Sequence, residues 1–98
     1  MADLTDQIMA RVRQAGIREG VLNVLSTHTT CTIFVNEFQP ALAADMRTFL
    51  ERVVAADADG RHNDPAQSDC DRMNADAHLR AMLLGHSLAL QISGGEVV

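Results

Sequence analysis

Apolar residues change their spacing several times along this chain, and these changes limit the folds that it can adopt. Helical spacing occurs within residues 4–15, 42–53 and 75–84. Apolar, β-branched runs at 20–36 and 88–92 are typical of strands. The first run can form two strands or one long bent strand. The resulting order is helix, strand pair, helix, long loop, helix, strand, which predicts an α+β fold in a single domain of 98 residues.

Residues with strong local preferences mark the ends of these helices. Gly16 and Gly85 are predicted to end the first and third helices. Pro40 suits the first turn of the second helix, and Asn74 is predicted to cap the third. We expect the second helix to bury an apolar stripe against a sheet, formed by Leu42, Met46, Phe49, Leu50 and Val53. The third helix carries an apolar face formed by Leu79, Met82 and Leu83.

Two polar segments interrupt this pattern and are candidate sites. Residues 57–73 form the longest irregular stretch, beginning with Asp57-Ala58-Asp59. Loops longer than about 12 residues are uncommon in compact domains and often carry function. Residues 26–30 place a Ser/Thr-rich patch inside an apolar run, where it indicates a bend or a plain hairpin tip. Gly94-Gly95 predicts a tight turn near the end of the chain.

Charge and cysteine content exclude several classes of function. The net charge is −5, which argues against nucleic acid as a partner. All eight cationic residues are Arg, whose planar side chain suits contacts to carboxylate or phosphate. No apolar stretch approaches the roughly 20 residues that span a bilayer, and the acidic start does not resemble a signal peptide. The two cysteines do not form a Cys-x-x-Cys pair, so we expect reduced thiols in the cytoplasm. Cys31 is expected to be a small core residue and not a nucleophile.

Three histidines are candidate metal ligands because hydroxyl or carboxylate residues accompany them in sequence. They are His28, His62 and His78. Neutral imidazole binds Zn²⁺, and three protein ligands with one open position is the catalytic arrangement. The spacing alone is weak evidence, since the sequence has no His-x-His or His-Glu-x-x-His pair. A structural role is the alternative, and His86 is expected only to complement a helix C-terminus.

Three carboxylates are candidate acid or base groups. Glu37 follows a predicted strand, Asp45 lies in the second helix and Asp64 follows His62-Asn63. A general acid or base works best with a pKa near neutrality, which burial would provide. The alternative for Glu37 and Asp45 is that they are acids favoured near a helix N-terminus.

Four sequence blocks resemble one known family. The run from His28 to Glu37 resembles the His-Thr-Thr signature of secondary thiamine-phosphate synthases, the YjbQ-like proteins. Asp45 occupies the position of an Asp in the helix that follows. His62-Asn63-Asp64 resembles the family's loop motif, and residues 74–79 with Leu84-Gly85 resemble a third motif. The blocks occur in the family's order over almost the whole chain.

The resemblance implies a two-layer, β-sandwich-like fold with flanking helices and assembly as a homotrimer. It also implies a divalent metal, Zn²⁺ or Mg²⁺, and weak synthesis of thiamine phosphate from a pyrimidine pyrophosphate and a thiazole phosphate. His28, His62 and His78 would bind the metal, and Glu37, Asp45 and Asp64 would act as acid/base groups or orient the ligands. Arg61 or Arg80 would contact the phosphorylated molecule.

The resemblance also predicts a chain that is truncated at both ends. Family members usually carry a strand before the first helix and a Leu-Gly-Thr-Trp-Gln strand after the glycine turn, whereas this sequence contains no Trp. We expect unpaired sheet edges as a result. Two alternatives to the enzyme therefore stay open: a non-catalytic module that binds a metal or phosphorylated ligand, and an inactive fragment that serves only as a subunit.

Overall fold

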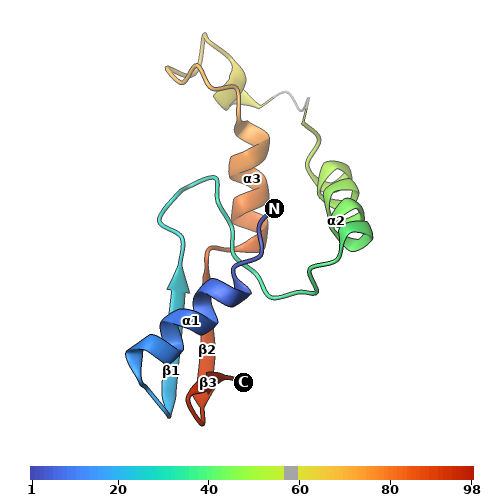
Figure 1. Ribbon diagram of the computed structural model, residues 1–98. Coiled ribbons are helices and arrows are strands. Elements are labelled where there is room, and N and C mark those ends of the chain that lie inside the picture. Colours follow the sequence, from blue (N-terminus) through green and yellow to red (C-terminus); the bar gives the residue numbers. More distant parts are fainter. Residues whose placement is uncertain (57–59) are drawn as a thin grey trace. The chain divides into compact units, whose positions relative to one another are not determined.

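The computed structural model describes residues 1–56 and 60–98, which fold into two compact units (Figure 1). The terminal unit comprises Met1–Leu25 and Ser87–Val98, and the central unit comprises Ser26–His86. The terminal unit contains α1 (Thr5–Ala15), β1 (Gly20–Leu25), β2 (Ser87–Ser93) and β3 (Glu96–Val97). The central unit contains α2 (Pro40–Val53), the 3₁₀ turn η1 (Arg61–Asn63) and α3 (Ala75–Leu84). The single-domain organisation stays a prediction.

The terminal unit is built on an antiparallel sheet with the strand order β1-β2-β3. Leu22 lies opposite Leu90, and Leu25 lies opposite Ser87 at the far end of the ladder. Gly94-Gly95 connects β2 to β3, with φ angles of 62° and 89°. A tight turn with positive φ at both central residues favours glycine, so the predicted turn is confirmed.

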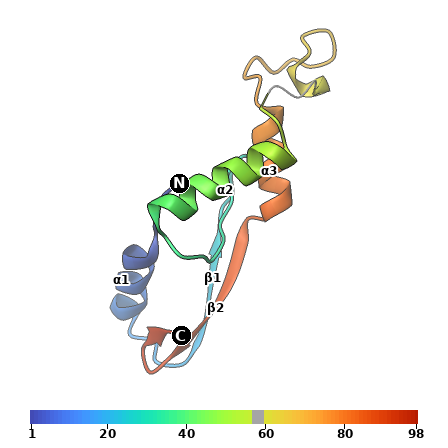
Figure 2. The ribbon, with the colours of Figure 1, turned by 90° about the vertical axis from the view of Figure 1, so that its right-hand side faces the viewer.

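Helix α1 provides the second layer of the terminal unit and lies alongside the strands (Figures 1 and 2). Val12 of α1 and Ile92 of β2 are each 3% exposed, which makes them the most buried apolar side chains of this unit. The helix ends at Gly16, which has a φ of 67°, as predicted. At its start, the Asp3 carboxylate accepts a hydrogen bond from the Thr5 N–H at 2.9 Å.

Polar side chains fix the edges of the terminal unit. Arg13 of α1 forms an ion pair with Glu96 of β3 at 2.9 Å, with both side chains largely exposed. The Glu19 carboxylate accepts a hydrogen bond from the Gly94 N–H at 2.9 Å and therefore holds the β2–β3 turn next to the start of β1.

In the central unit, hydrogen bonds satisfy both ends of α2. Pro40 occupies the first turn, as predicted, and the Gln39 side chain accepts a hydrogen bond from the Leu42 N–H at 2.7 Å. At the other end, the Arg80 guanidinium of α3 donates to the Val54 carbonyl oxygen from Nε at 3.2 Å and from Nη2 at 2.7 Å. This contact links the end of α2 to α3.

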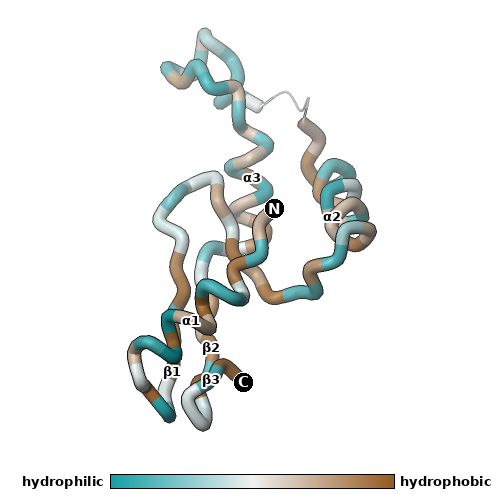
Figure 3. Tube along the Cα trace, viewed as in Figure 1, coloured by the Kyte–Doolittle hydropathy of each residue, from teal (hydrophilic) through white to brown (hydrophobic). Residues whose placement is uncertain are grey.

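Three predictions about apolar residues are wrong in the described chain. Residues 31–35 lie outside every strand, because the described residues provide no partner strand for their backbone groups. Hydrophobic residues recur along α2 (Figure 3), yet no α2 residue is buried, and Phe49 of the expected stripe is 58% exposed. The expected apolar face of α3 is also exposed, while the buried positions of that helix are Ala75 and Ala81.

The α+β class is confirmed by three helices and a three-stranded antiparallel sheet in the part of the chain that the structure describes. That part forms a single sheet, so the two-layer, sandwich-like arrangement stays a prediction. No helix among the described residues has the length and apolar character needed to cross a bilayer. Within the expected long loop, residues 61–63 form η1, whereas Asp57, Ala58 and Asp59 lie outside the described residues.

Candidate functional site

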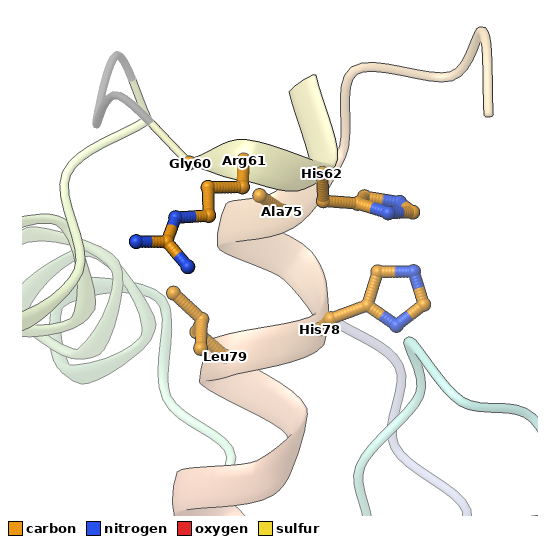
Figure 4. Close-up of a pocket in the computed structure, with 6 residues that line it drawn as sticks. All are labelled: Gly60, Arg61, His62, Ala75, His78 and Leu79. Carbon is orange, nitrogen blue, oxygen red and sulfur yellow. The ribbon is translucent and has the colours of Figure 1, made fainter. Parts of the chain in front are cut away.

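A pocket of about 350 Å³ lies where η1 meets the start of α3 (Figure 4). Its lining residues lie in two of the motif blocks or directly before one of them, and they are Gly60, Arg61, His62, Ala75, His78 and Leu79. The side chain of Ala75 is small and buried, which leaves space beside the first turn of the helix. The lining therefore includes two imidazoles, one guanidinium and the apolar side chains of Ala75 and Leu79.

His62 and His78 come together in this pocket. Their ring centroids are 4.9 Å apart and the ring planes make an angle of 80°, an edge-to-face arrangement. Both rings project to the same side of α3, whereas Arg61 and Leu79 project to the other side (Figure 4). Two of the three predicted metal ligands are thus neighbours, although 16 positions separate them in sequence.

Two asparagines join η1 to α3 by reciprocal hydrogen bonds. The Asn74 side-chain oxygen accepts a hydrogen bond from His62 Nε2 at 3.0 Å, so His62 carries a proton on Nε2. The Asn63 side-chain oxygen accepts one from the Ala75 N–H, also at 3.0 Å. Asn74 occupies the N-cap position of α3, as predicted, but its side chain makes no capping hydrogen bond, and the Asn63 side chain provides the acceptor instead. When His62 is neutral, its lone pair is on Nδ1. This arrangement suits a metal ligand, because the hydrogen bond at Nε2 orients the ring and leaves Nδ1 available.

His28 lies outside this pocket, in an exposed turn of the central unit. Its Nδ1 accepts a hydrogen bond from the Thr30 N–H at 3.2 Å and lies 3.0 Å from the Thr30 hydroxyl. Within residues 1–56 and 60–98, no three His, Cys, Asp or Glu side chains lie close enough to hold one metal ion. The three-histidine site stays a prediction, with His62 and His78 as its adjacent members.

The three candidate carboxylates do not line the pocket. Glu37 and Asp45 are exposed, in the segment before α2 and within α2. Asp64 follows η1, where its carboxylate accepts hydrogen bonds from Gln67 Nε2 at 2.6 Å and from the Ala66 N–H at 2.9 Å. These donors hold the pKa of Asp64 below its ordinary value, so the group is ionised at neutral pH and is a weaker base than an unperturbed carboxylate.

The two candidate arginines are in different environments. Arg61 is exposed and lines the pocket. Arg80 is partly buried, donates to the Val54 carbonyl and pairs with Asp76 at 3.1 Å. Its donors therefore stabilise the fold, which leaves Arg61 as the candidate for phosphate binding. Cys31, expected in the core, is exposed, because the segment that contains it is not a strand.

Sequence reasoning missed the roles of Asn63 and Asn74. Both lie beside the candidate histidines in the motif blocks, and an amide next to a metal-ligand candidate was the available signal. Sequence spacing could not show that Asn74 forms a hydrogen bond with His62 of η1, or that Asn63 forms one with Ala75 of α3.

Comparison with known proteins agrees with the resemblance in sequence. A family model described as "UPF0047 protein YjbQ-like" matches residues 1–98. A UPF0047 protein of Methanothermobacter thermautotrophicus is 38% identical over 97 residues, which are 99% of this chain and 64% of that protein. A UPF0047 protein of Archaeoglobus fulgidus is 34% identical over 97 residues, or 97% of this chain and 68% of that protein. The chain thus spans about two thirds of the length of these relatives.

Solved structures show the same fold. A YbjQ-like protein of unknown function from Sulfolobus solfataricus matches with a TM-score of 0.88 and 29% identity, covering 99% of this chain and 66% of the other. A hypothetical protein from Aeropyrum pernix matches with a TM-score of 0.87 and 28% identity, covering 98% of this chain and 67% of the other. The sequence and structural matches both extend over nearly the whole chain, and the chain belongs to the YjbQ-like family of UPF0047 proteins.

Proposed function

We propose that this chain binds a divalent metal, Zn²⁺ or Mg²⁺, and a phosphorylated molecule, and that it acts as a weak thiamine-phosphate synthase. The observation that carries this proposal is the pocket that places His62 and His78 edge to face, with Arg61 on its rim. Imidazole lone pairs suit a divalent metal, and a guanidinium suits phosphate oxygens. The free thiols Cys31 and Cys70 support a reducing, cytoplasmic location.

The proposed reaction is an alkyl transfer. The ring nitrogen of the thiazole phosphate attacks the methylene carbon of the pyrimidine pyrophosphate with its lone pair. A carbon–nitrogen bond forms, the carbon–oxygen bond to pyrophosphate breaks, and pyrophosphate leaves with the electron pair. A bound metal would supply positive charge to the leaving group. Arg61 would hold phosphate oxygens in place and neutralise part of their charge.

Completion of the site requires residues from outside the pocket. We propose that the chain assembles as a homotrimer and that Glu37, Asp45 and Asp64 act as acid/base or ligand-orienting groups in that assembly. Large apolar side chains that are exposed in the central unit support association, since a neighbouring subunit could bury them; they include Phe38, Phe49, Val53, Met82 and Leu83. In the predicted three-histidine set the third ligand would be His28, which lies outside the pocket.

Turnover of the two thiamine precursors tests the enzymatic proposal. Purified protein with Zn²⁺ or Mg²⁺ should form thiamine phosphate and release pyrophosphate in equal amounts, measured by chromatography. Arg61→Ala should lower the rate at least about tenfold, because a charge-assisted contact to phosphate is lost. Arg47→Ala, on the exposed surface of α2, is the matched control and should leave the rate unchanged. Equal rates in the two variants would exclude Arg61 from the site.

A second candidate is a binding module without turnover. The described lining of the pocket favours it, because the lining contains groups that can bind a ligand but none of the three carboxylates proposed for the enzyme. Metal analysis and pyrophosphate titration separate the two functions. Binding that His78→Ala abolishes, with no product from the two precursors, would support the module and exclude the enzyme.

A further inference from the structure

The hydrogen bonds at His28 differ in kind from those at His62. His28 Nδ1 accepts a hydrogen bond from the Thr30 backbone N–H at 3.2 Å. A backbone N–H can only donate, so Nδ1 must present a lone pair, and the proton of the neutral ring is then on Nε2. His62 donates from Nε2 to Asn74 and keeps its lone pair on Nδ1. The two rings thus offer opposite groups to a ligand: His28 offers an N–H and His62 offers a lone pair.

The local backbone fixes the arrangement at His28. The Thr30 hydroxyl lies 3.0 Å from the same Nδ1 and can donate to it. The His28 N–H donates to the Ser26 hydroxyl at 3.3 Å, and the His28 carbonyl accepts from the Cys31 N–H at 3.3 Å. A metal on Nε2 would require the ring proton to move to Nδ1, where it would face the Thr30 N–H. Coordination by His28 would therefore break the hydrogen bond from the Thr30 N–H that orients the ring.

We infer that His28 is a neutral hydrogen-bond donor, through Nε2–H, to an anionic oxygen of the phosphorylated ligand, and that it is not a metal ligand. This inference rests on the proposed function and replaces its third histidine ligand. Thr30 is a positioning residue, because its N–H selects the tautomer that points a donor outward. His28 is exposed, so Nε2 is accessible to a ligand. The metal site then consists of His62, His78 and groups from outside the described chain.

Nitrogen-15 NMR of the imidazole rings tests the tautomer without any ligand. At neutral pH, His28 should show its proton on Nε2 and a deprotonated Nδ1. Thr30→Ala should leave this pattern unchanged, because the backbone N–H is retained. A His28 ring with its proton on Nδ1 would overturn the inference, whatever the enzyme assay shows.

Titrations with Zn²⁺ and with inorganic pyrophosphate test the role. His28→Ala should weaken pyrophosphate binding about tenfold or more, because a hydrogen bond to a charged oxygen is lost, and should keep the zinc stoichiometry of the wild type. In His28→Gln, the amide N–H replaces Nε2–H, so pyrophosphate affinity should stay within about threefold. His78→Gln is the matched control and should lose zinc.

Two results would count against the donor role of His28 and leave the rest of the proposed function standing. One is loss of zinc in the His28 variants to the extent seen in His78→Gln. The other is unchanged pyrophosphate affinity in His28→Ala while wild type still forms thiamine phosphate. Wild-type protein that binds no pyrophosphate would overturn the donor role together with the phosphate part of the proposed function. Native mass measured on each variant confirms that the compared proteins share one assembly.

Discussion

The terminal unit buries Val12 and Ile92 to 3% exposure, whereas the buried apolar residues among the described part of the central unit are the alanines Ala75 and Ala81. Apolar packing between a helix and a sheet stabilises the first unit. Hydrogen bonds from the side chains of Asn63, Asn74 and Arg80 connect the elements of the second. The central unit therefore keeps its local geometry through polar contacts while its large apolar side chains stay exposed. A segment of this kind can present a site and an association surface together.

Truncation of the core of the terminal unit should have the largest effect on stability. Ile92→Ala is expected to lower the free energy of unfolding by about 2–5 kcal/mol, because it removes buried methyl groups and leaves a cavity. Val21→Ala is the matched control: this residue belongs to the same sheet but is 66% exposed, so its change should cost less than about 0.5 kcal/mol. Urea denaturation measures both. Similar losses would mean that another surface covers Val21.

Removal of the arginine that links α2 to α3 should have the next largest effect. Arg80→Ala is expected to cost about 1–3 kcal/mol, since the Val54 carbonyl loses two donors and Asp76 loses its partner. Arg80→Lys should restore part of this stability, because it keeps the charge but not the planar fork. Denaturation of both variants against Arg47→Ala is the measurement. No difference between Arg80→Ala and Arg47→Ala would show that the contact does not stabilise the central unit.

Loss of the cap on α3 should have a smaller effect. Asn63→Ala is expected to cost about 1 kcal/mol, the usual cost when a helix N-terminus loses its side-chain acceptor. Asn63→Asp keeps an acceptor oxygen and adds a charge favoured at a helix N-terminus, so its stability should be within about 0.5 kcal/mol of wild type. Amide hydrogen exchange at Ala75 provides a local readout. Equal protection of Ala75 in Asn63→Ala and wild type would contradict the cap.

The smallest effect is expected at the Asp64 turn and depends on pH. The folded pKa of Asp64 is lowered, so the turn's contribution is present above the ordinary value of 3.8 and is lost as pH falls through the lower folded value. Carboxyl carbon NMR should give a titration midpoint below 3.8 for Asp64. Gln67→Ala should move that midpoint upward, because the 2.6 Å donor is lost. An unchanged midpoint would rule out Gln67 as the cause.

Local sequence signals predicted the elements of both units. Gly16, Pro40 and Gly85 marked helix ends correctly, and Gly94-Gly95 marked the turn between β2 and β3. Each of these residues has a backbone preference that acts over one or two positions, so no knowledge of the tertiary structure was needed.

Properties that depend on a partner could not be predicted in this way. The β-rich composition of residues 31–35 indicated a strand, but a strand forms only where another strand satisfies its backbone groups. The helical spacing of Phe49 predicted α2 correctly but could not show what covers its apolar stripe. Likewise, sequence spacing gave His62 and His78 as candidates, whereas their 4.9 Å approach depends on how η1 meets α3.

The pairing of β1 with β2 also has a consequence for the folding rate. Leu25 and Ser87 are register partners, and the whole central unit lies between them in sequence. Closing so long a segment costs more chain entropy than closing the Gly94-Gly95 hairpin. Contacts between distant residues also slow folding. We expect β2 and β3 to pair early and β1 to join late. Pulse-labelled hydrogen exchange should therefore protect the Val98 amide, which donates to the Gln91 carbonyl of β2 at 2.9 Å, before the Leu22 amide of β1.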